Sequence, residues 1–347
     1  MQANLPAPAT GGSALPGRLN LLTDVGGVAV GHATDLALGS GVTVILFDRP
    51  AVMSVAVLGG APGGRDLGAL APGASVDGVD SVVLSGGSAF GLDAAGGVQA
   101  SLREQGRGFQ VAGRLVPMVA QAILFDLANG GAKDWGRFSP YRDLGYAAAS
   151  AASGGRFALG SVGAGTGATT ATVKGGLGSA STGTRTGHRV AAIVAVNAIG
   201  TPTIGETRWF WAAPFEQEAE FGGLGWPERL APGNLAPILK GAAATVSTTI
   251  GLVATDAALT KPQAHRLALM AHDGLARAVL PAHAPMDGDT LFAAATGARP
   301  LADPVLELTE LGHAAITVVA RAIARGVYEA TALPAPGAQP AWRDRFG

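Results

Sequence analysis

The chain has 347 residues, of which 48% are hydrophobic and only 14% are charged, and its formal net charge is −1. Because it contains no basic run, we expect neither nucleic acid nor an anionic membrane as a partner. The sequence has no cysteine, which excludes disulfides, thiolate nucleophiles and zinc–cysteine sites. The small charged fraction and the 53 glycines predict a large core and a homo-oligomer with neutral interfaces.

The N-terminus does not have the pattern of a targeting segment. Residues 1–18 contain proline and glycine but no basic stretch followed by an apolar core, so we interpret them as a flexible tail. No apolar run elsewhere reaches the length needed to cross a bilayer. We therefore expect a cytoplasmic protein.

Three apolar runs in the first third of the chain have the length and composition of strands: residues 42–47, 53–57 and 79–84. Asp48-Arg49-Pro50 separates the first two runs and predicts a turn. The third run leads into Ser85-Gly86-Gly87-Ser88, and we expect a helix over residues 92–104. A helix N-terminus offers free N–H groups, so Ser85, Gly86, Gly87 and Ser88 are candidate oxyanion donors. A tight structural turn is the alternative.

Small residues dominate the middle of the chain. Lys174 is the only lysine between residues 154 and 187, so it is either a solvated surface group or a charge placed in a pocket. Residues 189–196 predict a strand that ends at Asn197.

An irregular connector is expected over residues 221–241, where glycine and proline recur. It precedes Ser247-Thr248-Thr249 and an apolar run over residues 250–254, which predicts a buried strand. A β-branched threonine at the mouth of a strand has few rotamers, which suits a rigidly held nucleophile. The alternative is that these hydroxyls only satisfy backbone groups.

Two helices are expected in the last third of the chain. The first begins after Thr260, which has the position of an N-cap, and the second runs over residues 304–329. The proline-rich segment after the second helix is expected to be loose.

Asp287 and Asp289 flank a single glycine, so both carboxylates can point into one pocket. Close carboxylates drive their pKa values apart, which suits proton handling and the orientation of an amine. A hard-cation site and a plain turn are the alternatives. We expect no metal and no cofactor.

The available nucleophile is a hydroxyl, because the chain lacks cysteine and a convincing Ser-His-Asp arrangement. The α-amine of an N-terminal threonine is a suitable base, since its pKa of about 7.7–8.0 lies near working pH. Thr248 would acquire such an amine if the chain cut itself after Ser247 through an N→O acyl shift.

Three segments together resemble one known family: residues 247–259, 271–277 and 287–292. This family comprises self-processing L-aminopeptidase/D-esterases, β-aminopeptidases and 6-aminohexanoate-oligomer (nylon-oligomer) hydrolases. The agreement extends upstream through residues 20–32, 84–93 and 189–197, so it covers nearly the whole chain.

The resemblance implies an α/β (α+β layered) fold, an αββα sandwich of N-terminal-nucleophile hydrolase type. It also implies one interwoven domain, cut into a long chain (19–247) and a short chain (248–347) and assembled as tetramers.

The resemblance also implies roles for single residues. Thr248 matches the nucleophile, and Ser247–Thr248 matches the processed bond. Asn197 matches the residue that supports the oxyanion. The roles of three further residues are implied in the same way: Asp287 and Asp289 match the acidic pair that orients the nucleophile and its amine, and Lys174 matches a lysine that reinforces this network in the nylon-oligomer hydrolases.

Two positions depart from the family pattern. Ser247 stands where relatives often have Asn or Gly, and Ile123-Leu124-Phe125 stands where the aminopeptidase members have Glu-x-Tyr. A buried substrate ammonium would therefore lack its carboxylate, which is unfavourable. Ile123 and Phe125 are expected to line a substrate pocket for methylene-rich amides.

The sequence therefore predicts a cofactor-free amide hydrolase that acts on small linear oligoamides or peptides, of the 6-aminohexanoate-oligomer type, through an acyl-enzyme on Thr248. An L- or β-aminopeptidase/esterase of the same family is one alternative. A non-catalytic ligand- or metal-binding assembly that uses Asp287 and Asp289 is an alternative of another class.

Overall fold

The computed structural model describes residues 15–241 and 247–347. Most of the predicted N-terminal tail, residues 1–14, lies outside the described residues. Its C-terminal end is attached to a strand, because the Gly17 N–H donates to Ser181 Oγ at 2.9 Å and the Leu15 carbonyl accepts from the Gly183 N–H at 3.2 Å. The prediction of a flexible tail is therefore wrong for residues 15–18.

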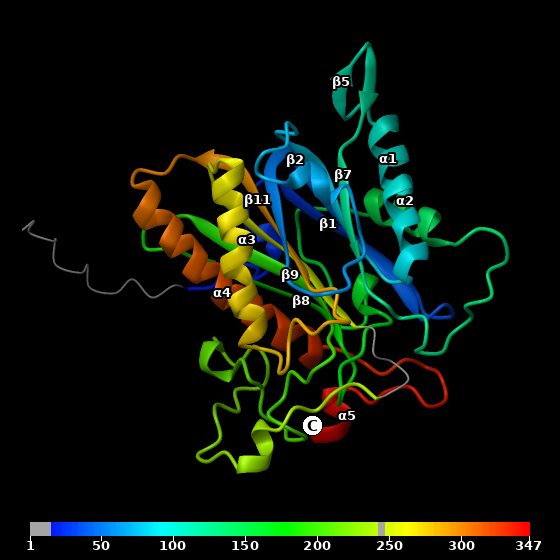
Figure 1. The fold of residues 1–347 in the computed structure, drawn as a ribbon, viewed down its shortest axis with the longest axis vertical. Coiled ribbons are helices and arrows are strands. Elements are labelled where there is room, and N and C mark those ends of the chain that lie inside the picture. Colours follow the sequence, from blue (N-terminus) through cyan, green and yellow to red (C-terminus); the bar gives the residue numbers. More distant parts are fainter. Residues whose placement is uncertain (1–14, 242–246) are drawn as a thin grey trace, which may run out of the picture.

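Hydrogen-bonded strands form the centre of the molecule, in the order β3-β7-β4-β2-β11-β10-β9-β8, with β1 paired to β2. Their bounds are β1 Val28–Asp35, β2 Ser40–Val57, β3 Gly64–Arg65, β4 Val79–Ser85, β7 Val119–Ile123, β8 Gly176–Gly183, β9 Arg189–Asn197, β10 Thr248–Ala257 and β11 Thr290–Arg299. A small separate hairpin, β5 (Phe109–Val111) with β6 (Arg114–Val116), projects from the body (Figure 1).

Helices cover both outer faces of these strands (Figure 1). Helix α4 packs on β8 and β9, and α3 packs on β2 and β11. On the other side, α1 and α2 pack on β1, β2, β4 and β7. The helix bounds are α1 Ala94–Glu104, α2 Tyr141–Ser150, α3 Lys261–Ala276, α4 Pro304–Tyr328 and α5 Trp342–Phe346.

Alternating side chains along each strand define the layers. On β10, Ile250 and Leu252 join Ile45 and Leu84 of the other half-sheet in one core, while Val253 points to the core beneath α3 and α4. Two sheets thus face each other between two helical layers, which confirms the predicted αββα sandwich. Thr248 lies two residues before Ile250, so its side chain points to the same face of the strand. It therefore lies at the edge of the space between the sheets.

Strand β2 corrects one sequence prediction. Residues 42–47 and 53–57 belong to a single 18-residue strand, and Asp48-Arg49-Pro50 is no turn. The first part of β2 pairs with β4, the last part pairs with β11, and the β4 register shifts between Leu46 and Ala51. Proline lacks an N–H for a ladder, and here it lies where the strand changes partners, which is why the extended backbone tolerates it.

The C-terminal segment corrects another prediction. Residues after α4 are not loose, because Trp342 is 5% exposed and its ring stacks on Phe210 at 5.4 Å between centroids. The Trp342 indole N–H donates to the Arg208 carbonyl at 3.1 Å. A buried aromatic ring with a paired N–H anchors an otherwise irregular segment.

The other predicted elements agree with the structure. Helix α1 begins at Ala94, after a 3₁₀ turn over Ser88–Asp93, and β9 ends at Asn197 as expected. Thr260 caps α3 by accepting the Gln263 N–H, within a capping box. Residues 221–241 carry only one short 3₁₀ turn, so the connector is irregular as predicted.

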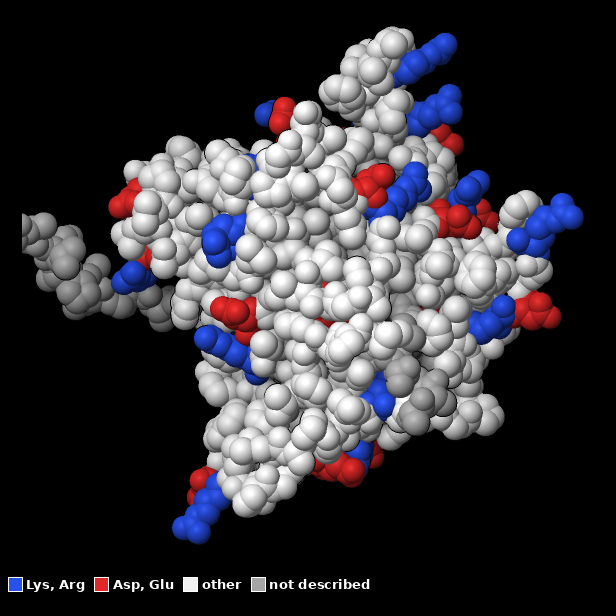
Figure 2. Space-filling model, viewed as in Figure 1, with Lys and Arg blue, Asp and Glu red and all other residues white. Residues whose placement is uncertain are grey.

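The surface reflects the low charged fraction. On the face shown in Figure 2, charged side chains are scattered and do not gather into a large patch of one sign. Within residues 15–241 and 247–347, no helix combines the length and apolarity needed to span a membrane.

Candidate active site

Thr248 lies at the first position of β10, directly opposite Asn197, the last residue of β9. Its side chain is 3% exposed. The Thr248 hydroxyl donates to the carbonyl oxygen of Ser247 at 2.5 Å, and the Gly288 N–H donates to the same oxygen at 2.9 Å. The Ser247–Thr248 carbonyl therefore lies between a hydroxyl and a backbone N–H donor.

Gly288 has to lack a side chain. A Cβ at this position would lie 2.7 Å from Thr248 Oγ1 and 3.1 Å from the Ala61 carbonyl oxygen. The glycine between the two aspartates therefore allows the turn to approach the hydroxyl. The sequence showed this glycine but gave no sign that its N–H faces the Ser247 carbonyl.

Asp289 fixes the start of β10. Its Oδ1 accepts the Thr249 N–H at 2.8 Å, and its Oδ2 accepts the His283 N–H at 3.0 Å and lies 2.8 Å from His283 Nδ1. The carboxylate thus joins the residue after Thr248 to the loop before Asp287. His283 was missed by the sequence analysis, because no pattern connects it to the acidic pair.

Asp287 is buried but poorly paired. Among the residues that the structure describes, its carboxylate accepts one long hydrogen bond, 3.4 Å from the Ala284 N–H to Oδ2, and Oδ1 has no partner. Burial, followed by the nearby Asp289 carboxylate, raises the pKa of Asp287 to about 7. Asp287 can therefore exchange a proton near neutral pH.

Asn197 is held from both ends of its amide. Its Oδ1 accepts the Thr169 N–H at 3.0 Å, and its Nδ2 donates to the Phe125 carbonyl at 3.0 Å. These contacts fix the amide beside Thr248.

Lys240, a residue of the irregular connector, also reaches Asn197. Its Nζ lies 3.2 Å from Asn197 Oδ1. Burial lowers the pKa of Lys240 to about 7, an effect that attraction to Asp287 opposes. Sequence analysis missed this residue; the only hint is that it is the sole cation between residues 230 and 247.

Lys174 is a charge placed in the interior, not a surface group. It is 1% exposed, and its Nζ donates to the carbonyls of Gly165 at 2.9 Å and Gly175 at 2.8 Å. Burial lowers the pKa of Lys174 to about 7, against the attraction of Asp126. Its hydrogen bonds go to these carbonyls and not to Asp287 or Asp289, so the structure gives no direct contact for the implied reinforcement of the acidic pair.

A cavity of about 400 Å³ adjoins Asn197. It is lined by Phe125, Thr169 and Lys240, the three residues that form hydrogen bonds with the Asn197 side chain. Phe125 therefore lies where a substrate-pocket residue was expected. Ile123 is 7% exposed and its side chain packs against Gly63 instead of lining this cavity. The C-terminal segment, residues 333–339, supplies one wall.

The candidate oxyanion donors at Ser85–Ser88 are already engaged. The N–H groups of Gly86, Gly87 and Ser88 donate to the Gly41 carbonyl, Asp126 Oδ1 and the Leu124 carbonyl, at 3.0, 2.8 and 2.9 Å. The Ser85 hydroxyl donates to the Gly91 carbonyl at 3.1 Å. This correction favours the structural alternative: the segment is a tight turn that orients Asp126.

Metal ligation has little support in the geometry. No group of three or more His, Asp or Glu side chains that could hold a metal ion occurs in residues 15–241 and 247–347. Both oxygens of Asp289 already accept hydrogen bonds, as described above.

Thr248, Asn197, Asp287 and Asp289 thus meet at one edge of the inter-sheet core. The model of peptidase family S58 matches residues 20–339. An uncharacterized aminopeptidase of Mycobacterium tuberculosis is 40% identical over 346 residues, which cover 94% of this chain and 98% of that protein. A 6-aminohexanoate-oligomer endohydrolase of Kocuria sp. is 29% identical over 295 residues, covering 81% of this chain and 76% of that protein.

Two solved structures share the fold. The β-aminopeptidase of Burkholderia sp. has a TM-score of 0.70 at 24% identity, over 96% of this chain and 93% of that chain. The L-aminopeptidase D-Ala-esterase/amidase of Ochrobactrum anthropi, described as a variant of the Ntn hydrolase fold, has a TM-score of 0.68 at 21% identity, over 96% and 91%. The chain belongs to peptidase family S58 and is an amide- or peptide-bond hydrolase with the N-terminal-nucleophile fold.

Proposed function

We propose that the chain cuts its own Ser247–Thr248 bond and then hydrolyses small linear oligoamides or peptides through an acyl-enzyme on Thr248. One observation carries the proposal most directly. The Thr248 hydroxyl and the Gly288 N–H converge on the Ser247 carbonyl oxygen, at 2.5 and 2.9 Å. The nucleophile is therefore next to the bond it would cut, and a donor is aimed at the oxygen that would become negative.

Self-processing begins when Thr248 Oγ1 attacks the carbonyl carbon of Ser247. The C–N bond breaks, the nitrogen keeps the electron pair and takes the hydroxyl proton, and an ester joins Ser247 to the Thr248 oxygen. Water then hydrolyses this ester, which leaves a Ser247 carboxylate and a free α-amine on Thr248.

Substrate turnover repeats the same chemistry on another amide. The Thr248 α-amine takes the hydroxyl proton, Oγ1 attacks the substrate carbonyl, and the proton passes to the leaving amine. Water then hydrolyses the acyl-enzyme. In this scheme Asp289 holds the start of β10, Asp287 faces the new amine, and Asn197 supports the oxyanion from the opposite strand.

The substrate class divides into two candidates. We favour linear oligoamides of the 6-aminohexanoate type, which the apolar Phe125 beside the cavity supports. Peptides with a free amino end are the second candidate, because the relative that is 40% identical is named an aminopeptidase.

We also propose that the long and short chains stay together as one domain and assemble as tetramers. Light scattering of the purified protein tests this assembly.

The test of the mechanism compares Thr248→Ala with Thr249→Ala in the full chain. Thr248→Ala should remain one chain of full mass on a denaturing gel and lose amide hydrolysis by at least about a thousandfold. Thr249→Ala is the matched control, since it removes a hydroxyl one position away and should be cut normally. A Thr248→Ala protein that is cut or keeps full activity would disprove the mechanism. A panel of α-peptides, β-peptides and 6-aminohexanoate oligomers then separates the substrate classes.

A further inference from the structure

The contacts of the Asn197 side chain divide unequally between its oxygen and its nitrogen. Oδ1 accepts from Lys240 Nζ at 3.2 Å and from the Thr169 N–H at 3.0 Å, and the Thr169 hydroxyl lies 3.4 Å away. Nδ2 donates to the Phe125 carbonyl at 3.0 Å, its one acceptor among the described residues. Because an amide nitrogen carries two hydrogens, one N–H of Asn197 stays available to a further acceptor.

The donors on Oδ1 decide which way this amide faces. The two ends of an amide have nearly the same shape and differ only in their hydrogen bonding. Rotation by half a turn would place Nδ2 against Lys240 Nζ and the Thr169 N–H, donor against donor. Lys240 therefore helps to keep the oxygen on its own side of Asn197 and the available N–H on the other.

Lys240 is tied to the same part of the fold as the amide that it holds. Its backbone N–H donates to the Ile199 carbonyl at 2.9 Å, two residues after Asn197. Asn197 in turn is the direct partner of Thr248 across β9 and β10, so the two side chains lie on one face of the sheet. The bonds of Lys240 to Asn197 and Ile199 stay within the long chain and do not depend on the Ser247–Thr248 peptide.

The two proposed reactions make different demands on Asn197. In self-processing, the oxygen that becomes negative belongs to Ser247, and the Gly288 N–H already donates to it at 2.9 Å. In turnover, the oxyanion belongs to the substrate, and it needs a donor that is oriented before the reaction begins. A residue that orients the Asn197 amide should therefore affect turnover and leave self-processing nearly unchanged.

We propose that Lys240 is a positioning residue for turnover, which holds the Asn197 amide so that its available N–H can donate to the substrate oxyanion. This role deepens the proposed function and rests on it for the participation of Asn197 in catalysis. Lys240 acts through Asn197 and not on the reacting atoms. It assigns a task to a connector residue that stands seven positions before the proposed cut.

The test follows both reactions in Lys240→Met and Lys240→Arg. Lys240→Met should cut itself within about twofold of the wild-type rate, measured on denaturing gels after cell-free synthesis. Its kcat for the linear 6-aminohexanoate trimer should fall about tenfold, with KM changed less than about threefold, because the Thr169 N–H still holds Oδ1. Lys240→Arg keeps an N–H donor and should restore kcat to within about threefold of the wild type.

Arg229→Met is the matched control, since Arg229 is an exposed cation of the same connector and should match the wild type in both reactions. The proposal is overturned if Lys240→Met hydrolyses the trimer at the wild-type rate or if Lys240→Arg fails to restore kcat. Equal slowing of both reactions would also overturn it, because that result marks a purely structural role.

NMR of the Asn197 side-chain amide in the uncut Thr248→Ala protein tests the positioning without any turnover. Lys240→Met in this background should speed the interchange of the two Nδ2 protons at least about twofold, since one of the donors that restrain the amide is lost. Arg229→Met should leave the interchange unchanged. An unchanged rate in Lys240→Met overturns the positioning role even if the wild type does not hydrolyse the trimer, whereas a Thr248→Ala protein that is cut disproves the proposed function instead.

Discussion

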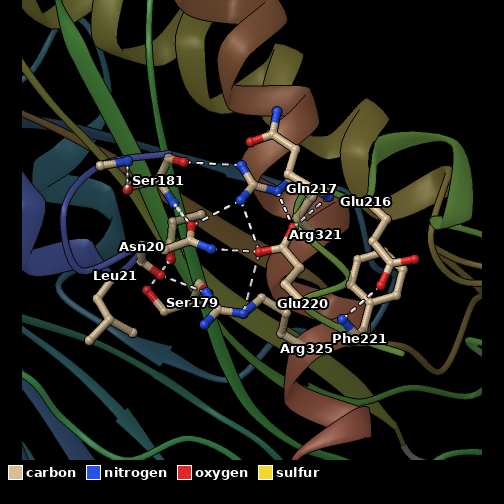
Figure 3. A network of polar contacts seen from close by, with 12 residues as sticks. Asn20, Leu21, Ser179, Ser181, Glu216, Gln217, Glu220, Phe221, Arg321 and Arg325 are labelled. Atoms are coloured by element: carbon tan, nitrogen blue, oxygen red, sulfur yellow. Dashed lines mark hydrogen bonds and ion pairs between the residues drawn. The ribbon is translucent and has the colours of Figure 1, made fainter. Parts of the chain in front are cut away.

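Two clusters of buried charge differ in how completely their groups are paired. The arginine network consists of Asn20, Ser181, Glu220, Arg321 and Arg325 (Figure 3). Arg321 is 0% exposed and donates to both Glu220 oxygens, at 2.5 and 2.9 Å, and to the Ser181 carbonyl at 3.0 Å. The site cluster consists of Asp287, Lys240 and Lys174. Here Asp287 Oδ1 has no partner within the described part of the chain.

The difference shows how burial of charge serves two purposes. In the arginine network, the Glu220 carboxylate faces both Arg321 and Arg325, and the guanidinium groups also donate to oxygens of Asn20, Ser179 and Ser181, which holds segments together. In the site cluster, burial exceeds the available pairing, so the pKa of Asp287 rises and those of Lys174 and Lys240 fall, each to about 7. Groups that exchange protons near neutral pH suit catalysis better than stability.

The arginine network also joins the two chains that the proposed cut would produce. Asn20, Ser181 and Glu220 precede Thr248 in the chain, whereas Arg321 and Arg325 follow it on α4. Asn20 Nδ2 donates to Glu220 Oε2 at 2.6 Å, and Arg321 Nη2 donates to Asn20 Oδ1 at 2.9 Å. The bonds from Arg321 to Asn20, Ser181 and Glu220 cross the proposed cut and do not depend on the Ser247–Thr248 peptide, so they can hold the two chains together after cleavage.

The largest expected effect comes from breaking the arginine network. Arg321→Met removes the main partner of the buried Glu220 carboxylate, so the free energy of unfolding should fall by about 3–5 kcal/mol. Urea unfolding measures this, in a Thr248→Ala background that keeps the chain intact. Arg185→Met is the control: Arg185 is 51% exposed in its ion pair with Glu310, and its loss should change stability by less than about 1 kcal/mol. Equal effects of the two substitutions would contradict the comparison.

A smaller effect of opposite sign is expected in the site cluster. The pKa of Asp287 is raised from its usual 3.8 to about 7, so the native state binds more protons than the unfolded state between these values. The stability of the Thr248→Ala parent should therefore decrease as pH rises from about 4 to 7. Asp287→Asn removes this dependence and should be more stable than the parent by about 1–3 kcal/mol above pH 7, with little difference near pH 4.

Unfolding measured across this pH range in the Thr248→Ala background tests the prediction. Parallel stability curves for the two proteins would show that Asp287 is ionised normally in the native state. The site cluster would then be as well paired as the arginine network.

The sequence predicted the parts of the molecule that regular periodicity controls. The apolar run over residues 250–254 placed Thr248 at the mouth of a buried strand, and the Asp-Gly-Asp spacing predicted that both carboxylates share one pocket. The link between this acidic pair and Thr248 came from the family resemblance. Pro50 led to the wrong prediction of a turn, because a strand that changes partners tolerates a proline that ordinarily marks a turn. The two-sheet arrangement came from the family resemblance, since local patterns do not define which strands stack.

The residues that the sequence did not reveal reach the site from irregular segments. Lys240 belongs to the connector, and residues 333–339, which form one wall of the cavity, belong to the segment that was expected to be loose. Their positions depend on particular tertiary contacts, such as the stacking of Trp342 on Phe210. No hydrophobic period encodes such contacts, so sequence reasoning finds the strand-borne site residues and misses the walls of the cavity.

The smallest expected effect concerns the attraction between Lys240 and Asp287, which partly balances the charges of the site cluster. Lys240 lowers the pKa of Asp287, against the larger effects of burial and Asp289. Lys240→Met should therefore raise the pKa of the Asp287 carboxyl, and Lys240→Arg should change it less because the charge remains. Carbon NMR of the Asp287 carboxyl in the Thr248→Ala background measures the shift. An unchanged or lower pKa would mean that the connector cation does not act on Asp287, and that burial and Asp289 alone account for its protonation near neutral pH.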